Sequence, residues 1–330
     1  MSHRPARPAP RSRLITWLAA IGAITALALG LPGASAAADD TSRPHSGPTV
    51  STPEALIRGT LQPDAPPPGA NDWKCKPTAA HPRPVVLLHA TLTNAQNWIM
   101  LSPWLKKAGY CVFAPNYGGE PGSPFKATRH IPDSAREIAR YVDRVLDATG
   151  ARQVDLVGHS QGGGLMPRWY LRFEGGTNPA NPAKNKVRRL IALAPSNHGA
   201  GVTGLGNLTT ELGLNSTVSL VVGRAYEDQM PGSRVHTTLD RDGDTQPGVD
   251  YTTIVTRYDE VVTPYTNQFL TAGPGATVRN ILIQEICPQD ISEHISIAFD
   301  SNALQLVLNA LDPAHARPVH CSLSAPLLGG

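Results

Sequence analysis

Short apolar runs alternate with stretches of helical periodicity along most of the chain after residue 84. The predicted strands cover residues 85–89, 110–115, 154–157, 187–194, 250–256 and 278–286. The predicted helices cover residues 97–108, 134–149, a segment that ends at 173, and 291–311. Alternation of this kind is typical of a mostly parallel sheet with helices on both faces. With no internal repeat, the pattern predicts a single α/β domain.

The clearest predicted helix covers residues 134–149. Ser134 and Glu137 have the spacing of a capping box, and Gly150 stands where a helix-ending glycine belongs. The apolar residues fall on one face of this helix, namely Ala135, Ile138, Ala139, Val142, Val145 and Leu146. A second feature interrupts the alternation near residues 197–238, a stretch rich in Gly, Thr, Leu and Val with a predicted helix near 208–223. We interpret it as an insertion that shapes a pocket.

The N-terminal 36 residues have the pattern of a secretory signal peptide. Four arginines precede an apolar stretch from Leu14 to Leu31, and Ala34-Ser-Ala36 matches a cleavage site. The alternative is an uncleaved anchor, because 18 apolar residues are close to the minimum for a membrane span. After cleavage we expect no stable membrane span. Residues 37–74 are proline-rich and are predicted to form an extended arm, followed by one domain over residues 75–330.

Cleavage also changes the charge. The whole chain has a formal net charge of +3, but removal of residues 1–36 leaves 25 basic and 26 acidic residues. The balance gives no reason to expect a nucleic-acid partner. We expect a secreted, extracellular monomer that needs no cofactor.

Four cysteines remain after cleavage: Cys75, Cys111, Cys287 and Cys321. An even number in an exported chain predicts two disulfides, for which three pairings are possible. The sequence-local pairing closes two loops of about 35 residues, each worth about 3–4 kcal/mol in the chain-entropy model. No metal site is expected. The chain has no C-x-x-C spacing, and Asp240-Arg-Asp-Gly-Asp244 departs from a calcium loop because its glycine is fourth and no glutamate closes it.

A candidate nucleophile follows the third predicted strand. Val154-Asp-Leu-Val leads directly into Gly158-His-Ser160-Gln-Gly162, and a helical segment comes next. A strand, a Gly-x-Ser-x-Gly turn and a helix form the nucleophile elbow of α/β-hydrolases. Side chains at positions 158 and 162 would collide with the neighbouring strand and helix, so both glycines are needed. The predicted fold is therefore the α/β-hydrolase fold, with Ser160 as the nucleophile.

A serine nucleophile needs a base and an acid to orient that base. In this fold the chain order is serine, acid, histidine, which excludes His89 and His159. The remaining histidines are His198, His236, His294, His315 and His320. Asp259 follows a strand after the elbow, and His294 follows the next strand, so they are the predicted acid and base. Glu260 is an alternative acid.

The negative oxygen of a tetrahedral intermediate needs hydrogen-bond donors that are already in place. The backbone N–H of Gln161, the residue after the nucleophile, is the first predicted donor. Thr91, in the loop after the first strand, is the second, through its backbone N–H and its hydroxyl. An ordinary strand-to-helix loop is the alternative interpretation of this segment.

These motifs give the chain a specific resemblance. It resembles the secreted actinobacterial triacylglycerol lipases, known as class 2 lipases, and more distantly Candida antarctica lipase B. The matching stretches are Val85-Val-Leu-Leu-His-Ala-Thr with Asn97-Trp98, Gly158-His-Ser-Gln-Gly-Gly, Ala194-Pro-Ser-Asn-His-Gly199, Gln229-Met-Pro-Gly-Ser233 and Thr256-Arg-Tyr-Asp-Glu-Val-Val262. The chain departs from the family pattern at Ala90, where glycine is usual, and at Met230, where glutamine is common.

The resemblance implies a triad of Ser160, Asp259 and His294, and an oxyanion hole shaped by Thr91 and Gln161. It also implies the disulfides Cys75–Cys111 and Cys287–Cys321. The expected activity is that of a serine carboxylic-ester hydrolase, a triacylglycerol lipase or esterase, acting on ester or lipid substrates at a lipid–water interface. A cutinase-like polyester hydrolase or an acyltransferase would use the same triad. A non-catalytic binding module is the alternative from another functional class.

Overall fold

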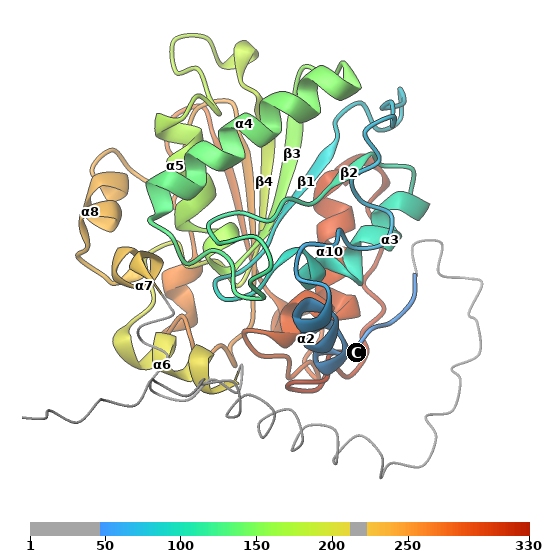
Figure 1. Ribbon diagram of the computed structural model, residues 1–330, viewed down its shortest axis with the longest axis vertical. Coiled ribbons are helices and arrows are strands. Elements are labelled where there is room, and N and C mark those ends of the chain that lie inside the picture. The colour runs from blue at the N-terminus through green and yellow to red at the C-terminus, as the bar shows by residue number, and fades with distance from the viewer. Residues whose placement is uncertain (1–46, 212–222) are drawn as a thin grey trace, which may run out of the picture. The chain divides into compact units, whose positions relative to one another are not determined.

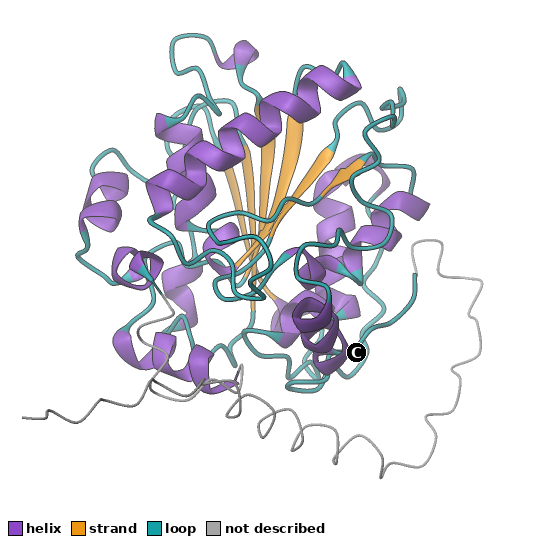
Figure 2. Ribbon diagram, in the orientation of Figure 1, coloured by secondary structure: helices purple, strands orange, loops and turns teal. Residues whose placement is uncertain are grey.

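Six parallel strands form one sheet in the order β2-β1-β3-β4-β5-β6. The strands are β1 Val85–Leu88, β2 Val112–Phe113, β3 Val154–His159, β4 Val187–Leu193, β5 Asp250–Val255 and β6 Thr277–Leu282. Strand β3 lies near the middle, where Val157 is in register with Leu87 of β1 and Ile191 of β4. Figure 2 shows the strands side by side between helices. The predicted parallel sheet is confirmed.

The computed structural model describes residues 47–211 and 223–330. The predicted signal peptide, residues 1–36, lies outside the described residues. So do residues 212–222, which contain most of the predicted helix near 208–223. No helix within the two described ranges is both long enough and apolar enough to cross a membrane.

Helices cover both faces of the sheet. In Figure 1, α4 and α5 run across the face turned toward the viewer, and α10 lies on the other side. The helices are α2 Thr52–Leu61, α3 Leu101–Lys107, α4 Ile131–Thr149, α5 Leu165–Phe173, α6 Val202–Glu211, α7 Arg224–Gln229, α8 Arg234–Asp240, α9 Ile283–Ile286 and α10 Ser301–Leu311. Short 3-10 turns cover residues 95–98, 160–162, 182–184, 265–268, 296–299 and 313–315.

The buried apolar side chains form a cluster on each face of the sheet. Val85 and Leu87 point toward α3 and α10, whereas Val86 and Leu88 point toward α4 and α5. This alternation follows from the two-residue period of a strand. Because both faces are covered there, β1 is an unbroken buried apolar run, whereas β6 at the edge of the sheet is partly or fully exposed over most of its length.

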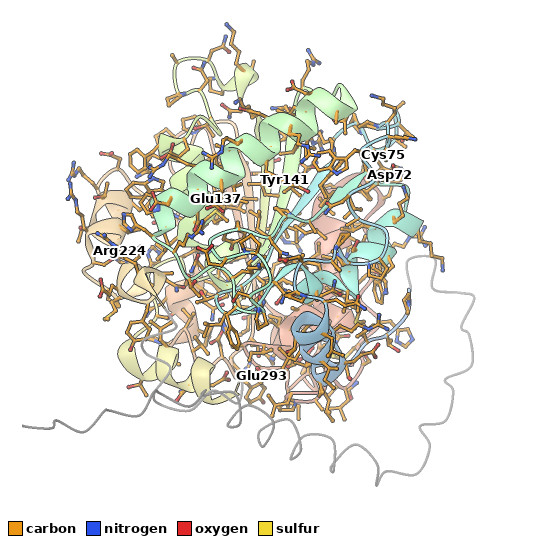
Figure 3. The ribbon with its side chains drawn as sticks, viewed as in Figure 1. Asp72, Cys75, Glu137, Tyr141, Arg224 and Glu293 are labelled. Atoms are coloured by element: carbon orange, nitrogen blue, oxygen red, sulfur yellow. A yellow bond between two sulfur atoms is a disulfide. The ribbon has the colours of Figure 1, made fainter. Side chains whose placement is uncertain are left out.

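The N-terminal arm differs from the extended segment that was predicted for residues 37–74. Its described part contains α2, which begins after an N-cap at Ser51. Ala55 of this helix joins the core, and the carbonyl of Gly59 accepts a hydrogen bond from Asn94. Farther along, Asn71 pairs with the backbone of Ala114 and accepts from Tyr141 of α4, a residue labelled in Figure 3. Specific polar contacts therefore fix the segment, despite its prolines.

Helix α4 begins three residues earlier than predicted, and the capping box is wrong. The N-cap is His130, and Pro132 occupies the first turn, where its missing N–H is not needed. Glu137 instead accepts from the backbone N–H of Gly118, 2.9 Å away, and thereby holds a neighbouring loop. The predicted C-terminal glycine is confirmed, since Gly150 ends the helix in the left-handed conformation.

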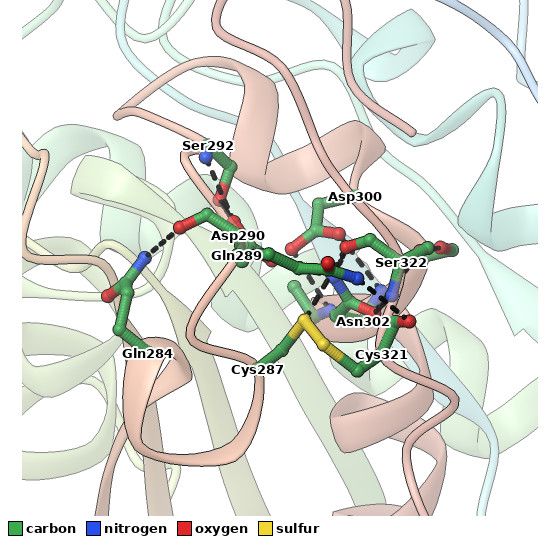
Figure 4. Close-up of a disulfide and its surroundings, with 11 residues drawn as sticks. Gln284, Cys287, Gln289, Asp290, Ser292, Asp300, Asn302, Cys321 and Ser322 are labelled. Atoms are coloured by element: carbon green, nitrogen blue, oxygen red, sulfur yellow. Dashed lines mark hydrogen bonds between the residues drawn. A yellow bond between two sulfur atoms is a disulfide. The ribbon is translucent and has the colours of Figure 1, made fainter.

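Both disulfides join cysteines that are close in sequence. Cys75 is bonded to Cys111, and Cys287 is bonded to Cys321, with sequence separations of 36 and 34 residues. The first joins Cys75, directly after the N-terminal arm, to Cys111, the residue before β2. The second joins the loop after α9 to the C-terminal segment (Figure 4). No free cysteine occurs in the described ranges.

Candidate active site

The turn after β3 has the geometry of a nucleophile elbow. Ser160 has a φ of 55°, a left-handed conformation that is unusual for a residue with a side chain. A Cβ at position 158 would lie 1.9 Å from the carbonyl oxygen of Gly162. A Cβ at position 162 would lie 2.4 Å from the carbonyl oxygens of Leu88 and His89. The predicted need for both glycines is confirmed. A side chain at position 162 would collide with the backbone at the end of the neighbouring strand β1.

Three side chains that are far apart in the sequence meet at this turn. His294 Nε2 lies 3.0 Å from Ser160 Oγ, and His294 Nδ1 lies 2.8 Å from Asp259 Oδ2. All three residues are buried. They follow β3, β5 and β6, whose carboxyl ends share one edge of the sheet because the strands are parallel. It is Asp259, rather than its neighbour Glu260, that forms the hydrogen bond to the imidazole.

The carboxylate of Asp259 is fixed from several directions. Oδ1 accepts from the backbone N–H groups of Val261 and Val262, at 2.9 and 2.7 Å. Oδ2 accepts from the side chain of Gln268 at 2.9 Å, in addition to His294. Buried charges need such partners to offset the loss of water. The carboxylate is therefore oriented before any substrate binds.

His294 experiences two opposing effects on its pKa. Burial lowers the pKa of the imidazole, because a charged ring is poorly solvated there. The charge of Asp259 and its hydrogen bond raise it, and Glu260 and Glu293 add smaller effects in the same direction, so the net pKa is above its ordinary value. An imidazolium that forms during a reaction is thus stabilised in place.

Thr91 accepts hydrogen bonds from two glutamine side chains. Gln161 Nε2 lies 2.9 Å from Thr91 Oγ1, and Gln229 Nε2 lies 3.1 Å from it. The carbonyls of Ala127 and Ala225 also accept from these two amides, which fixes the NH₂ end of each toward Thr91. A hydroxyl has two acceptor positions and one proton. With both acceptor positions filled, the Thr91 hydroxyl is left to donate.

The two histidines excluded as bases have different surroundings from His294. His159 Nε2 donates to the carbonyl of His294 at 2.8 Å, so this ring supports the backbone of the candidate base. Burial lowers the pKa of His159 to about 3 and the pKa of His89 to about 4, and both rings are neutral at ordinary pH. His89 stacks on Tyr117, whose hydroxyl donates to the His89 carbonyl at 2.6 Å.

The predicted insertion contributes to the site and to a separate cavity. Helix α7 supplies Gln229, and a cavity of ≈ 320 Å³ lies where α4, α5, α7 and α8 meet. Its lining includes Trp169, Arg224 and Val235. Figure 3 shows Arg224 at α7. The insertion therefore borders a cavity that Ser160, Asp259 and His294 do not line.

Two supporting residues were missed from the sequence, namely Gln229 and Gln268. Gln229 stands in one of the quoted stretches beside Met230, but its contact with Thr91 spans 138 residues. Gln268 follows Asp259 by nine residues without any recognisable motif. The other histidines lie elsewhere: His198 and His236 are close to each other, and His315 pairs with Asp312 on the surface.

Comparisons with known proteins agree with this geometry. A family model described as alpha/beta hydrolase fold matches residues 83–211, from just before β1 to the end of α6. The chain has the α/β-hydrolase fold. The solved structure of Aspergillus fumigatus lipase B shares this fold with a TM-score of 0.56 at 20% identity, over 88% of this chain and 64% of that one.

Two gastric lipases share a local stretch of sequence with this chain. Over 132 residues, the chain is 34% identical to the gastric triacylglycerol lipase of Mus musculus and 33% identical to that of Homo sapiens. Each match covers 34% of this chain and 31% of the relative. The matched part thus spans about a third of the length of either gastric lipase.

Proposed function

We propose that the protein is a serine carboxylic-ester hydrolase with Ser160 as nucleophile, His294 as base and Asp259 as the orienting acid. The continuous chain of contacts from Ser160 Oγ to His294 and on to Asp259, at 3.0 and 2.8 Å, is the observation that carries this proposal. The 3.0 Å contact lies in the range for proton transfer between a nucleophile and its base, and the 2.8 Å contact is a hydrogen bond that orients the base.

The first half of the reaction forms an acyl-enzyme. Ser160 Oγ attacks the ester carbonyl carbon, and its proton passes to His294 Nε2. The carbonyl oxygen becomes negative and accepts hydrogen bonds from the backbone N–H groups of Gln161 and Thr91 and from the Thr91 hydroxyl. When the bond to the alcohol breaks, His294 returns the proton to the leaving oxygen.

The second half releases the acid. A water molecule takes the place of the alcohol, gives its proton to His294 and attacks the acyl carbon. The ester bond to Ser160 Oγ breaks, and His294 protonates this oxygen again. Asp259 keeps its negative charge throughout and stabilises the imidazolium in each half.

The substrate we propose is a triacylglycerol or a simpler carboxylic ester at a lipid–water interface. The support comes from the quoted motifs of the secreted class 2 lipases and from two similar proteins whose names describe triacylglycerol lipases. We further propose that residues 1–36 are removed on export, which agrees with two disulfides in the mature part of the chain.

The test uses protein recovered from the culture medium, with an intact mass that starts near residue 37. Hydrolysis of p-nitrophenyl esters from C2 to C16 and of emulsified triacylglycerol is compared with that of Ser160→Ala. We expect at least a 10⁴-fold loss of kcat in this variant, since the nucleophile is removed. Ser134→Ala is the matched control, because Ser134 is also a buried serine but lies on α4.

The outcomes separate the possible functions. Unchanged hydrolysis in Ser160→Ala would overturn the mechanism, and no hydrolysis by the folded wild-type protein would favour a binding module. Action on C2–C4 esters alone would restrict the proposal to an esterase. Release of soluble acids from a polyester film, or transfer of the acyl group to an added alcohol, would favour the two other uses of the same triad.

A further inference from the structure

Two histidines and an aspartate gather at a site that the proposed reaction does not use. His198 lies in the loop after β4, and His236 and Asp240 lie one turn apart on α8. Each residue offers one ligand atom, and these atoms all lie within 4.8 Å of one another. Residues four apart on a helix share a face, so α8 presents its imidazole and carboxylate together.

The carboxylate of Asp240 stands between the two imidazoles. His236 Nδ1 lies 3.1 Å from Asp240 Oδ2, and His198 Nδ1 lies 3.9 Å from Asp240 Oδ1. Two ligands bound to one tetrahedral Zn²⁺ at about 2.0–2.1 Å are about 3.4 Å apart. The two separations differ from this value by about 0.3 and about 0.5 Å, and no pair of ligand atoms in the group is more than 4.8 Å apart.

The tautomer of His198 is set by its second nitrogen. Nε2 lies 3.0 Å from the carbonyl oxygen of Phe269, which can only accept, so this nitrogen carries the proton. In the neutral ring, Nδ1 then has a lone pair that faces the Asp240 carboxylate. A backbone carbonyl that accepts the distal N–H is the usual partner of a metal-bound histidine. A cation between Nδ1 and the carboxylate would turn a repulsive contact into an attractive one.

His236 provides an independent sign of a missing ligand. Its Nε2 is buried and has no hydrogen-bond partner among the described residues. Buried polar atoms are nearly always paired, so this unpaired ring nitrogen calls for an ion or a water. The cluster therefore contains a potential metal-ligating nitrogen that has no hydrogen-bond partner among the described protein groups.

The charge nearby suits a divalent cation. Arg168 of α5 lies 3.2 Å from Asp244 and 3.5 Å from Asp240. Asp244 also accepts from the backbone N–H of Thr271 at 2.7 Å, so it balances Arg168 and is already occupied. Asp240 accepts from the same arginine through Oδ1 at 3.5 Å, which leaves Oδ2, beside His236, to face a cation.

We propose that His198, His236 and Asp240 bind a structural Zn²⁺ ion, with water as the fourth ligand. Two imidazoles and one carboxylate favour Zn²⁺ over Ca²⁺ and Mg²⁺, which prefer oxygen ligands. The ion joins the loop after β4 to α8. In that loop, Asn197 donates to the carbonyl of Gln268, whose side chain holds Asp259. The site goes beyond the proposed function and does not depend on it.

The experiment measures metal binding to the full mature protein. The protein is stripped with a chelator and titrated calorimetrically with Zn²⁺, and Co²⁺ serves as a visible probe of tetrahedral nitrogen and oxygen ligands. We expect about one equivalent of Zn²⁺ per chain and a melting temperature that rises on binding, because the ion binds only the folded chain. His236→Gln and Asp240→Asn are each expected to weaken binding by at least about 100-fold, since loss of even an outer-shell partner costs about 10–100-fold.

The control is His315→Ala, which removes an exposed histidine from a pair with Asp312 that belongs to no group of three possible ligands among the described residues. This variant is expected to bind Zn²⁺ like the wild type. Circular dichroism of each stripped variant separates loss of ligand from loss of fold. Failure of the folded wild-type protein to bind Zn²⁺ or Co²⁺, or binding within twofold of wild type by both folded ligand variants, would overturn the proposal.

Discussion

At the scale of single residues, Thr91 illustrates how neighbours decide the role of a side chain. A threonine hydroxyl can donate or accept, and in a loop it often bonds to local backbone. Here the amides of Gln161 and Gln229 occupy both acceptor positions of Thr91 Oγ1. The hydroxyl proton therefore points to a partner other than these two amides. We propose that this partner is the oxygen of the tetrahedral intermediate.

Replacing Thr91 with valine tests this role, because valine keeps the shape and removes the hydroxyl. We expect Thr91→Val to lower kcat for ester hydrolysis by about 100-fold, the typical effect of losing one oxyanion donor, with little change in KM. The two glutamine amides also lose an acceptor, which costs about 1–3 kcal/mol of stability. Rates are therefore measured well below the melting temperature of the variant.

Thr91→Ser separates the two effects, since serine restores the hydroxyl without the methyl group. We expect it to recover most of the lost kcat. A full wild-type kcat in Thr91→Val would show that the backbone donors suffice and that the hydroxyl has no part in the reaction.

At the scale of elements, the sequence predicted the parts of the fold whose cause is local. The six strands and the glycines of the elbow follow from short patterns, and all are present. Two strands are clearly shorter than predicted: β2 has only two residues, and residues 283–286, predicted as the end of the last strand, form α9. The start of α4 was misplaced because Ser134 and Glu137 have the spacing of a capping box. In the structure, the Glu137 carboxylate accepts a hydrogen bond from the backbone N–H of Gly118 instead. Helix α2 was missed because the prolines around it dominate the composition.

The site residues divide in the same way into those that local sequence could predict and those that depend on distant parts of the chain. Ser160, Asp259 and His294 could be proposed because chain order and strand ends restrict the candidates. Gln229 and Gln268 could not, because their partners are fixed only by the tertiary structure. The contact of His198 with α8 has the same origin. Asp240 stands in the stretch that was rejected as a calcium loop, but nothing in the sequence links this residue to His198, 42 residues earlier.

Helix α10 supplies a prediction about pH. Its N-cap Asp300 accepts from the backbone N–H groups of Asn302 and Ala303, and it lies beside Asp290 (Figure 4). Burial raises the pKa of Asp300 well above its usual value, and the charge of Asp290 and the hydrogen bond between the two carboxyl groups raise it further. The folded state therefore binds this proton more tightly than the unfolded state does.

The sign of the effect follows from linkage. The stabilisation from the Asp300 proton is complete below the unfolded-state pKa of about 3.9 and is lost as pH rises through the folded-state value, with a slope of up to about 1.4 kcal/mol per pH unit. Asp300→Asn keeps an N-cap acceptor but cannot titrate. We expect its free energy of unfolding, measured with urea at several pH values, to decline less with rising pH than that of wild type.

Asp312→Asn, at the other end of the same helix, is the control for a general change in charge. It should keep the wild-type slope. An Asp300→Asn variant with an unchanged slope would show that the carboxyl pair does not hold a proton in the folded state.

At the scale of the whole described unit, the two disulfides close loops of similar length but have different surroundings. Cys75–Cys111 lies near the amino end of β2, away from the edge where Ser160 is found. Cys287–Cys321 fastens the C-terminal segment beside the loop that carries His294. There, the backbone N–H of Leu327 donates to Glu293 at 2.9 Å, and that of Ile291 donates to the carbonyl of Ser324 at 3.1 Å.

Removing each disulfide with paired serine substitutions separates stability from activity. Because the separations are 36 and 34 residues, the entropy that the unfolded chain regains predicts a similar cost for both, about 3–4 kcal/mol in guanidinium unfolding. Ester hydrolysis should respond differently. We expect Cys287→Ser/Cys321→Ser to lose at least tenfold in kcat well below its melting temperature, since the support of the His294 loop loosens. Cys75→Ser/Cys111→Ser, the matched control, should keep a kcat near that of wild type. Equal losses of kcat in the two folded variants would show that the C-terminal segment does not position His294, and that both disulfides act only on the stability of the fold.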